Sequence, residues 1–212
     1  MPGKKWEVFF QRQGFKYIAG IDEVGRGPLA GPVVAAAVIL PENISIRGIN
    51  DSKKLKEKER KRLFKTIQKR AISIGVGIVD HNTIDKINIA QATFAAMRLA
   101  VESLDPAPDI LLIDGNCEIN FSIPQKCIIK GDSKSISIAA ASIIAKVIRD
   151  KIMDEFDKLL PAYKFKKHKG YGTKLHFKII ETHGLSPIHR QSFNSSSKIP
   201  LDFEQISLIN FK

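Results

Sequence analysis

The sequence predicts an α/β protein built on a mixed β-sheet with helices packed on its faces. Three strand-like apolar segments come first in the chain, and the later strands alternate with helices, which is the order expected of a mixed sheet. A length of 212 residues suits one large domain with a small appendage, and 43% hydrophobic residues suffice for a buried core. We expect a lead-in over residues 1–16, the sheet domain over 17–160 and a basic helical extension with a tail over 161–212.

Five apolar segments have the length and composition of strands. Residues 33–40 (VVAAAVIL) form a continuous apolar run between two prolines, and residues 71–79 alternate between isoleucine or valine and smaller residues. Glycines within an alternating strand indicate close approach of another group, here expected on the outer face of residues 71–79. The five expected strands are residues 17–21, 33–40, 71–79, 110–113 and 126–130.

Helical periodicity accounts for most of the remaining chain. A strongly basic helix is expected from Asp51-Ser52 to Arg70, and a long helix that begins near residues 133–135 is apolar nearly all round in its first half. A last helix is expected over residues 173–183. In residues 83–104 the apolar positions recur every three or four residues, which predicts a buried face. These positions are Ile87, Ala90, Phe94, Met97, Val101 and Leu104.

The charge balance favours a polyanionic partner. The chain has 34 lysine and arginine residues against 22 aspartate and glutamate residues, a formal net charge of +12 and a pI near 9.7. Nucleic acid is the partner that such a charge indicates, although a basic surface also serves solubility alone. No apolar run approaches the ~20 residues of a membrane span. Cys117 and Cys127 form no CxxC pair, so we expect a cytoplasmic protein without zinc or disulfides.

Residues 17–32 (YIAGIDEVGRGPLAGP) carry the densest set of candidate functional residues. An apolar strand leads to two adjacent carboxylates, Asp22 and Glu23, and then to the turn Gly25-Arg26-Gly27. Adjacent acids at the end of a strand are costly to desolvate unless a cation or hydrogen bonds compensate them. An arginine between glycines suits close approach of the backbone to an anion. A hairpin turn with surface acids is the alternative for this stretch taken alone.

Two further aspartates, Asp114 and Asp132, each lie just beyond the end of an expected strand. Because adjacent parallel strands build sites at one edge of a sheet, Asp22 and Asp114 are expected there together. With Glu23 they make four carboxylates without matching histidines or cysteines, which indicates a hard divalent cation and not zinc. Two such ions support phosphodiester hydrolysis. The local alternatives are a helix N-cap at Asp132 and an Asp-Gly turn at Asp114.

Six segments are long, ordered and specific. They are IDEVGRGPLAGPVVAAAV at 21–38, DSKKL at 51–55, LLIDGN at 111–116, KGDSKSISIAAASIIAKVIRD at 130–150, HKGYGT at 168–173 and SPIHRQSF at 186–193. With them the chain resembles ribonuclease HII over nearly its whole length. The resemblance implies an RNase H-like fold with a small helical C-terminal part. It also implies endonucleolytic cleavage of RNA in RNA–DNA hybrids with Mg²⁺ or Mn²⁺, leaving 3′-hydroxyl and 5′-phosphate ends.

The resemblance assigns roles to individual residues. It places the four catalytic, metal-binding acids at Asp22, Glu23, Asp114 and Asp132. It places a ribonucleotide-sensing turn at Gly25, Arg26 and Gly27, and a junction-sensing tyrosine at Tyr171. A chain with both features is expected to incise duplex DNA on the 5′ side of a single embedded ribonucleotide. The related ribonuclease HIII family looks different, since it carries an extra N-terminal substrate-binding domain and lacks the arginine between glycines.

The basic segment that precedes the last helix is expected to follow the phosphates of an RNA–DNA hybrid or of ribonucleotide-containing duplex DNA. Lys166, Lys167 and His168 are the candidate residues. An ordinary solvated run is the alternative for the lysines, and a structural role is the alternative for the histidine.

The C-terminal tail contains a second candidate motif. Gln205, Leu208 and Phe211 have the QxxLxxF spacing of a sliding-clamp peptide, although Lys212 stands where a second aromatic residue is usual. A tail that docks on its own domain is the alternative. We expect the protein to be a monomer.

Two other classes of protein compete with this nuclease. A non-catalytic hybrid-binding module would share the basic surface, but it has no need for four clustered carboxylates. A resolvase- or transposase-like nuclease would keep the acids, but it would not need Gly25-Arg26-Gly27 together with Tyr171. The intact set of acids and the two sensing turns therefore favour the ribonuclease.

Overall fold

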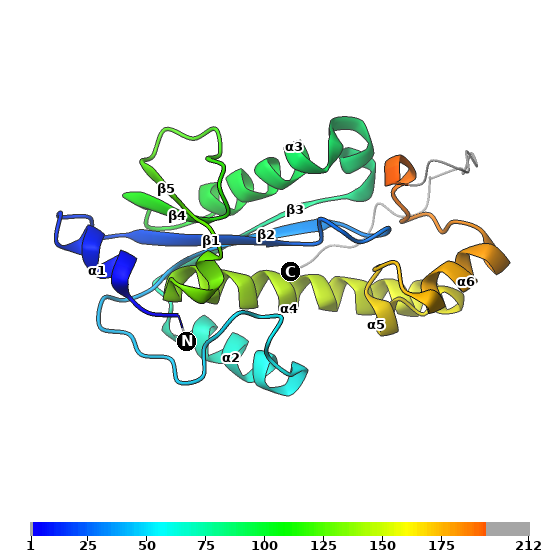
Figure 1. The fold of residues 1–212 in the computed structure, drawn as a ribbon, viewed down its shortest axis with the longest axis horizontal. Helices are drawn as coiled ribbons and strands as arrows, with labels where there is room; N and C mark the ends of the chain where they lie inside the picture. The colour runs from blue at the N-terminus through cyan, green and yellow to red at the C-terminus, as the bar shows by residue number, and fades with distance from the viewer. Residues whose placement is uncertain (1, 194–212) are drawn as a thin grey trace.

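Residues 2–193 are described by the computed structural model, and they contain a five-stranded mixed sheet flanked by helices (Figure 1). The strands are β1 (Ile18–Val24), β2 (Val33–Ile39), β3 (Ser73–Val79), β4 (Ile110–Asp114) and β5 (Gln125–Ile128). Their order across the sheet is β3-β2-β1-β4-β5. β2 is antiparallel to both β1 and β3, whereas β4 is parallel to both β1 and β5. The predicted mixed sheet is confirmed.

Helices cover both faces of this sheet. The α-helices of the described region are α1 (Lys5–Gln11), α2 (Glu57–Arg70), α3 (His81–Glu102), α4 (Ile136–Leu159), α5 (Phe165–His168) and α6 (Lys174–His183). α3 lies along one face and α4 along the other, and α2 packs against α4 (Figure 1). α5 and α6 lie near the C-terminal end of α4 and form the small helical C-terminal part. None of these helices is long and apolar enough to cross a lipid bilayer.

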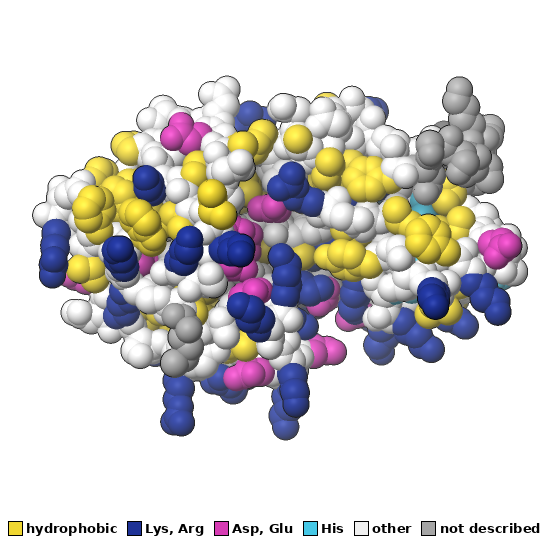
Figure 2. Space-filling model, viewed as in Figure 1, with side chains coloured by type: hydrophobic (Ala, Val, Ile, Leu, Met, Phe, Trp, Pro, Cys, Tyr) yellow, Lys and Arg dark blue, Asp and Glu magenta, His cyan; other side chains and the backbone are white. Residues whose placement is uncertain are grey.

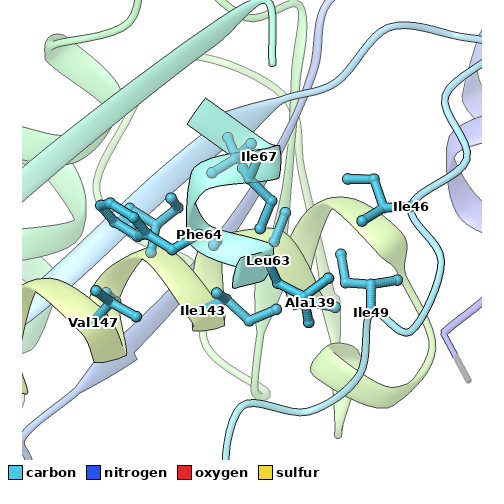
Figure 3. Close-up of a cluster of buried hydrophobic side chains, with 14 of the residues drawn as sticks. Ile46, Ile49, Leu63, Phe64, Ile67, Ala139, Ile143 and Val147 are labelled. Atoms are coloured by element: carbon cyan, nitrogen blue, oxygen red, sulfur yellow. The ribbon is translucent and has the colours of Figure 1, made fainter. Parts of the chain in front are cut away.

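α2 and α4 share a buried apolar layer with the sheet (Figure 3). Leu63 and Ile67 of α2 are fully buried and lie next to Ala139 and Ile143 of α4. Complete burial of a leucine or isoleucine side chain contributes ~1.5–3 kcal/mol. The buried residues of α2 follow the three-and-four spacing of one helix face, so its many cationic residues face water. This layer holds α4 along the sheet.

Small residues let the helices approach the strands closely. A Cβ at Gly75 or Gly77 of β3 would overlap a carbonyl oxygen of α3, and a Cβ at Gly20 of β1 would overlap the backbone of Ser137 in α4. The predicted close approach at β3 is confirmed, but it occurs on the buried face of the strand and not on its outer face. Ile78 on the opposite face is 39% exposed. The missing side chain at Gly20 likewise allows α4 to pack directly against β1, the strand that carries two of the candidate acids.

α2 begins five residues later than the sequence predicts. Asp51 and Ser52 do not open the helix, since they lie in a turn in which the N–H of Lys54 bonds the carbonyl of Asp51 at 3.0 Å. The side chain of Asp51 accepts from the N–H of Lys53 at 2.9 Å, so it satisfies a loop donor rather than a helix terminus. The helix starts at Glu57 instead.

α3 is kinked, which changes the face it buries. The helix begins at His81, and Asn88 interrupts it with φ 65° and ψ 165°. Met97 and the residues around it are buried as predicted. Ile87 and Ala90 are exposed, contrary to the prediction, because the kink turns the first part of the helix away from the face that its second half presents to the sheet.

Both ends of the described region pack on the sheet domain. In the lead-in, Phe10 of α1 is buried with Ile18 and Leu112, whereas Phe9 is 50% exposed. In the C-terminal extension, the buried Phe165 packs in one cluster with Ala30 of the loop between β1 and β2. The extension therefore shares apolar contacts with the loop that follows the first two candidate acids.

Candidate active site

Asp22 and Glu23 lie inside β1. The sequence had predicted that the strand ends before them, and this prediction is wrong. β1 continues through both acids because β2 pairs with it as far as Val24 and Val34. Apolar patterning alone ends the strand too early, since it does not anticipate carboxylates in the middle of a buried strand. The strand backbone thereby fixes both side chains rigidly.

The two adjacent carboxylates leave β1 on opposite sides, as alternation along a strand requires. Asp22 is only 7% exposed, and the hydroxyl of Ser142 on α4 hydrogen-bonds its carboxylate. Glu23 lines a small hollow together with Thr93 and Phe94 of α3. Each acid is thus held against the helix that covers its own side of the sheet.

Asp114 is the last residue of β4 and lies beside Asp22. β4 is parallel to β1 with Ile113 opposite Ile21, so the two aspartates follow next in register. The N–H of Gly131 donates to Asp114 Oδ1 at 2.6 Å. The structure therefore brings together the end of β4, the middle of β1 and the turn that follows β5.

Asp132 lies in that turn, a short 3₁₀ helix over Gly131–Ser133 directly before α4. It is not the N-cap of α4, because Ser135 takes that position and accepts a hydrogen bond from the α4 backbone at 3.2 Å. Burial raises the pKa of Asp132, and the negative charges of Asp51 and Asp114 raise it further. Asp51 is a carboxylate near the site that sequence reasoning missed, although it stands in the DSKKL segment.

The acid cluster carries more negative charge than its surroundings balance. The pKa of Asp22 is raised well above the ordinary value, first by burial and then by the charges of Glu23 and Asp114. Burial also raises the pKa of Glu23; Arg26 opposes this shift with Nη1 at 3.3 Å from Oε1, and Asp114 adds to it. Such mutual repulsion in a partly desolvated site is relieved by a bound cation.

The donor set of the cluster fits a hard divalent cation. Asp22, Glu23, Asp114 and Asp132 offer only carboxylate oxygens, the ligands that Mg²⁺ and Mn²⁺ prefer. Between residues 2 and 193, the structure contains no group of three or more histidine, cysteine, aspartate or glutamate side chains that could hold a metal ion. An open set of carboxylates suits Mg²⁺, which usually keeps several waters and takes further ligands from substrate phosphate.

The turn Gly25-Arg26-Gly27 follows the acids directly. Gly25 has φ 103°, and a Cβ there would overlap the side chain of Arg149, so the protein's own packing requires this glycine. At Gly27 a Cβ would meet no heavy atom within 4 Å, which leaves its surroundings open to an incoming group. The side chain of Arg26 is 58% exposed.

Arg190 holds this turn from inside the protein. It is fully buried, and its guanidinium donates to the carbonyls of Gly25 at 2.6 Å, Arg26 at 3.0 Å and Gly31 at 2.9 Å. Sequence reasoning gave Arg190 no role, although it stands in the SPIHRQSF segment. A planar group with five donors can tie several carbonyls of one loop together, which a lysine cannot do in the same way.

Arg149 of α4 does the same for the next part of the loop. Its buried guanidinium donates to the carbonyls of Ala30 at 3.2 Å, Pro32 at 3.0 Å and Lys169 at 3.0 Å. Lys169 belongs to the segment that leads to Tyr171. One side chain therefore connects the loop after β1 with the turn that carries the predicted junction sensor.

Tyr171 lies next to the loop after β1 and is 38% exposed. The N–H of Leu29 donates to the carbonyl of Gly170 at 2.8 Å, which joins the two turns directly. Lys146 and Arg149 lie over the Tyr171 ring at 5.9 Å and 5.7 Å from its centroid. The ring is thereby oriented from α4 while one side of it remains accessible.

The basic segment divides into exposed lysines and a buried histidine. Lys166 and Lys167 are exposed, so phosphate contact stays a prediction for them. His168 is only 6% exposed, its Nε2 lies 2.9 Å from the carbonyl oxygen of Tyr163, and its ring stacks on His176 at 4.1 Å. This burial and these contacts favour the structural alternative for His168, and its contact with phosphate stays a prediction.

Comparison with known proteins identifies the family. A family model described as ribonuclease HII matches residues 19–196. The ribonuclease HII of Listeria innocua is 56% identical over 203 residues, which cover 96% of this chain and 77% of that protein. The ribonuclease HII of Acetivibrio thermocellus is 58% identical over 185 residues, covering 87% and 72%. The chain belongs to the ribonuclease HII family.

Solved structures share the fold of this ribonuclease HII family member. Ribonuclease H2 of Pyrococcus horikoshii OT3 superposes with a TM-score of 0.68 at 26% identity, over 83% of this chain and 93% of that one. RNase HII of Archaeoglobus fulgidus, solved in a complex with PCNA, gives 0.71 at 25% identity, over 86% and 98%. Bst-RNase HIII in complex with Mn²⁺ gives 0.60 at 22% identity over 79% and 63%, which supports the fold alone.

Membership of the ribonuclease HII family makes the protein a ribonuclease H, a metal-dependent endonuclease that acts on RNA–DNA hybrids. The predicted family and enzyme class are confirmed, and the non-catalytic module is set aside. The family match begins at residue 19, so α1 lies outside it. The tail motif at Gln205, Leu208 and Phe211 lies outside the residues that the structure describes.

Proposed function

We propose that the protein also incises duplex DNA on the 5′ side of a single embedded ribonucleotide. The proposal rests on one observation, the backbone hydrogen bond between the loop that follows Gly25-Arg26-Gly27 and the segment that carries Tyr171. The backbone bond from Leu29 to Gly170 joins the loop after β1 to the segment that carries Tyr171, and Arg26 Nη1 lies 3.3 Å from Glu23 Oε1, which supports a shared role for the two turns beside the acids. A protein that only hydrolyses long hybrids has no need to read the nucleotide on each side of one ribose.

The turn residues suit recognition of one ribose. RNA differs from DNA by its 2′-hydroxyl, which both donates and accepts a hydrogen bond. The open space at Gly27 lets main-chain groups approach that hydroxyl, and the exposed guanidinium of Arg26 suits the neighbouring phosphate. The accessible side of the Tyr171 ring offers an apolar face to the following deoxyribose, where a second 2′-hydroxyl would intrude.

We propose Mg²⁺ or Mn²⁺ as the cofactor, held by Asp22, Glu23, Asp114 and Asp132. Two such ions, when bound, would neutralise charge on the scissile phosphate and orient the attacking water, which gives 3′-hydroxyl and 5′-phosphate ends. The chain's own contribution is to position the carboxylates on β1, on β4 and in the turn before α4. Ser142 orients Asp22, and Arg26 balances part of the charge of Glu23.

The decisive experiment is cleavage of a DNA duplex that contains one ribonucleotide, with an all-DNA duplex as the blank. The native protein is expected to cut on the 5′ side of the ribonucleotide in Mg²⁺ or Mn²⁺. Tyr171→Ala should lose this activity by about 100-fold, the size of effect that lost substrate positioning has. It should keep its fold, because the residue is partly exposed. Tyr171→Phe separates the hydroxyl from the ring. Native-like cutting by Tyr171→Ala would show that the junction-sensing role is wrong.

A second proposal concerns the tail. The QxxLxxF spacing of Gln205, Leu208 and Phe211 supports binding to a sliding clamp, as does the existence of a PCNA complex of the Archaeoglobus fulgidus relative. Deletion of residues 204–212 should then abolish clamp binding in a pull-down and leave hybrid cleavage intact. Equal clamp binding by the full and shortened chains would contradict it.

A further inference from the structure

α1 and its surroundings present cations and aromatic rings to solvent, and α1 precedes residue 19, where the match to the family model begins. We define the α1 surface by Lys4, Lys5, Trp6, Phe9, Arg12 and, from β5, Lys126. Except for Lys126, these residues line one open hollow along the helix. Figure 2 shows hydrophobic side chains surrounded by Lys and Arg at the α1 end of the molecule, and further Lys and Arg between them and the acidic side chains at the centre.

The α1 surface has no negative charge of its own. Among residues 2–193, none of its cations forms an ion pair with a carboxylate. Glu7, the one acid of α1, points inward: its Oε1 accepts from Ser135 Oγ at 2.6 Å and from the N–H of Ser137 at 3.0 Å. Lys126 Nζ lies 5.5 Å from the centre of the Trp6 ring, so the aromatic and cationic groups form one continuous face.

α1 is fixed close to the catalytic acids. The N–H of Ile136 donates to the carbonyl of Gly3 at 3.0 Å, and Glu7 binds the start of α4, which directly follows the turn that carries Asp132. Along β1, Ile18 at the α1 end lies four residues before Asp22, or ~13 Å at ~3.3 Å per residue. At ~3.4 Å per base pair, that span corresponds to about four base pairs of a duplex seated on the acids.

We propose that the α1 surface binds the sugar–phosphate backbone of the substrate duplex, on one side of the cleaved bond. Lys5 and Arg12 are exposed and suit phosphates. The half-exposed ring of Phe9 suits the apolar edge of a sugar. A cationic and aromatic face on the same side of the molecule as the start of α4 fits a polyanion that already lies across the active site.

The test measures how binding of an RNA–DNA hybrid depends on salt, in the Asp114→Asn background so that the hybrid is not cut. Each phosphate neutralised contributes about 0.9 to the slope of log K against log salt. The double variant Lys5→Gln/Arg12→Gln should therefore make the slope shallower by about two and weaken binding several-fold at low salt. The matched control is Lys65→Gln/Lys69→Gln on the exposed face of α2, which should leave the slope unchanged.

The position of the contact along the hybrid provides a second, independent readout. Shortening the hybrid from one end to about three base pairs beyond the cleavage point should remove the difference between the double variant and its parent. Shortening the other end should leave the difference intact. Equal slopes for the double variant and its control would overturn the proposal, as would a difference that survives shortening from either end. Loss of binding to anionic lipid vesicles with an unchanged hybrid slope would assign the surface to a membrane instead. The assay uses hybrid binding, so it stands whether or not single ribonucleotides are incised.

Discussion

Two fully buried arginines hold the loop between β1 and β2 and the segment before Tyr171. Arg149 and Arg190 each donate to backbone carbonyls of the loop between β1 and β2, and Arg149 also reaches the segment before Tyr171. Buried arginines are rare because their charge is costly to desolvate, and burial lowers the pKa of Arg190 to about 9. Their carbonyl partners compensate part of that cost. We infer that both are positioning residues for the sensing turns.

Arg190→Lys tests this role at the scale of one side chain. The substitution keeps the charge but removes the planar fork, so at least one buried carbonyl loses its partner. We expect a loss of ~1–3 kcal/mol in the free energy of unfolding, the cost of an unsatisfied buried group. We also expect a fall in cleavage rate of about tenfold or more, equivalent to ~1.4 kcal/mol, with hybrid binding retained. Urea titration and single-turnover kinetics measure the two effects, with Arg62→Lys on exposed α2 as control. If Arg190→Lys were destabilised but cleaved hybrid at the native rate, Arg190 would contribute to folding and not to positioning of the turns.

At the scale of elements, α5, α6 and the residues after them are held together by a histidine cluster. His168 stacks on His176, and His176 Nε2 lies 3.0 Å from His189 Nε2. Burial lowers the pKa of His176 to about 4, helped by His168, and lowers the pKa of His189 to about 3, helped by His176. His176 Nδ1 also bonds the carbonyl of Tyr171 at 3.0 Å. Neutral imidazoles therefore support the turn that carries the predicted junction sensor.

This cluster predicts a loss of stability in mild acid. The folded pKa values lie below the ordinary value of ~6.5, so the unfolded chain binds more protons as the pH falls. The stability contribution is fully present above about pH 6.5 and declines toward pH 4, by up to ~1.4 kcal/mol per pH unit for each imidazole. Urea midpoints measured from about pH 7.5 to about pH 5 should fall more steeply for the native protein than for His189→Gln, whose side chain cannot titrate. Parallel profiles would argue against the cluster as the cause.

At the scale of the whole molecule, patterning predicted the architecture and the proximity of Asp22 to Asp114, but not the position of Asp22 and Glu23 inside β1. The five strands and the four long helices were predicted from continuous runs of apolar residues and from the spacing of apolar residues along the chain. The register of β1 and β4 brings Asp22 and Asp114 together, as parallel neighbours at one sheet edge should be. Asp132 could be interpreted locally as an N-cap, and only the structure shows that Ser135 holds that position.

What the sequence did not predict depends on long-range contacts. β1 runs through two acids because β2 pairs with it, and α3 buries a different face because Asn88 kinks it. The partners of Arg149 and Arg190 lie more than 100 residues away for most of their bonds, so no local pattern shows them. The same holds for Glu7, whose hydrogen-bond partners follow it by 128 and 130 residues.

The last prediction concerns the cation and the whole fold together. The apolar layers on both faces of the sheet do not involve the acids, so chelation should abolish cleavage without unfolding the protein. Asp22 is buried with a raised pKa, so its ionised form destabilises the metal-free protein at neutral pH. Added Mg²⁺ should therefore raise the free energy of unfolding by ~2.7 kcal/mol at a hundredfold excess over Kd, and the melting temperature should rise with it.

Asp22→Asn separates this effect from folding. The amide carries no charge to desolvate, so the variant should be at least as stable as the metal-free native protein. It should gain little from Mg²⁺, cleave no hybrid and still bind hybrid, because we expect the lysines and not the acids to hold phosphates. Thermal melts with and without Mg²⁺, together with a binding titration, measure all three. A native-like rise in melting temperature, or near-native turnover, for Asp22→Asn would remove Asp22 from the metal site.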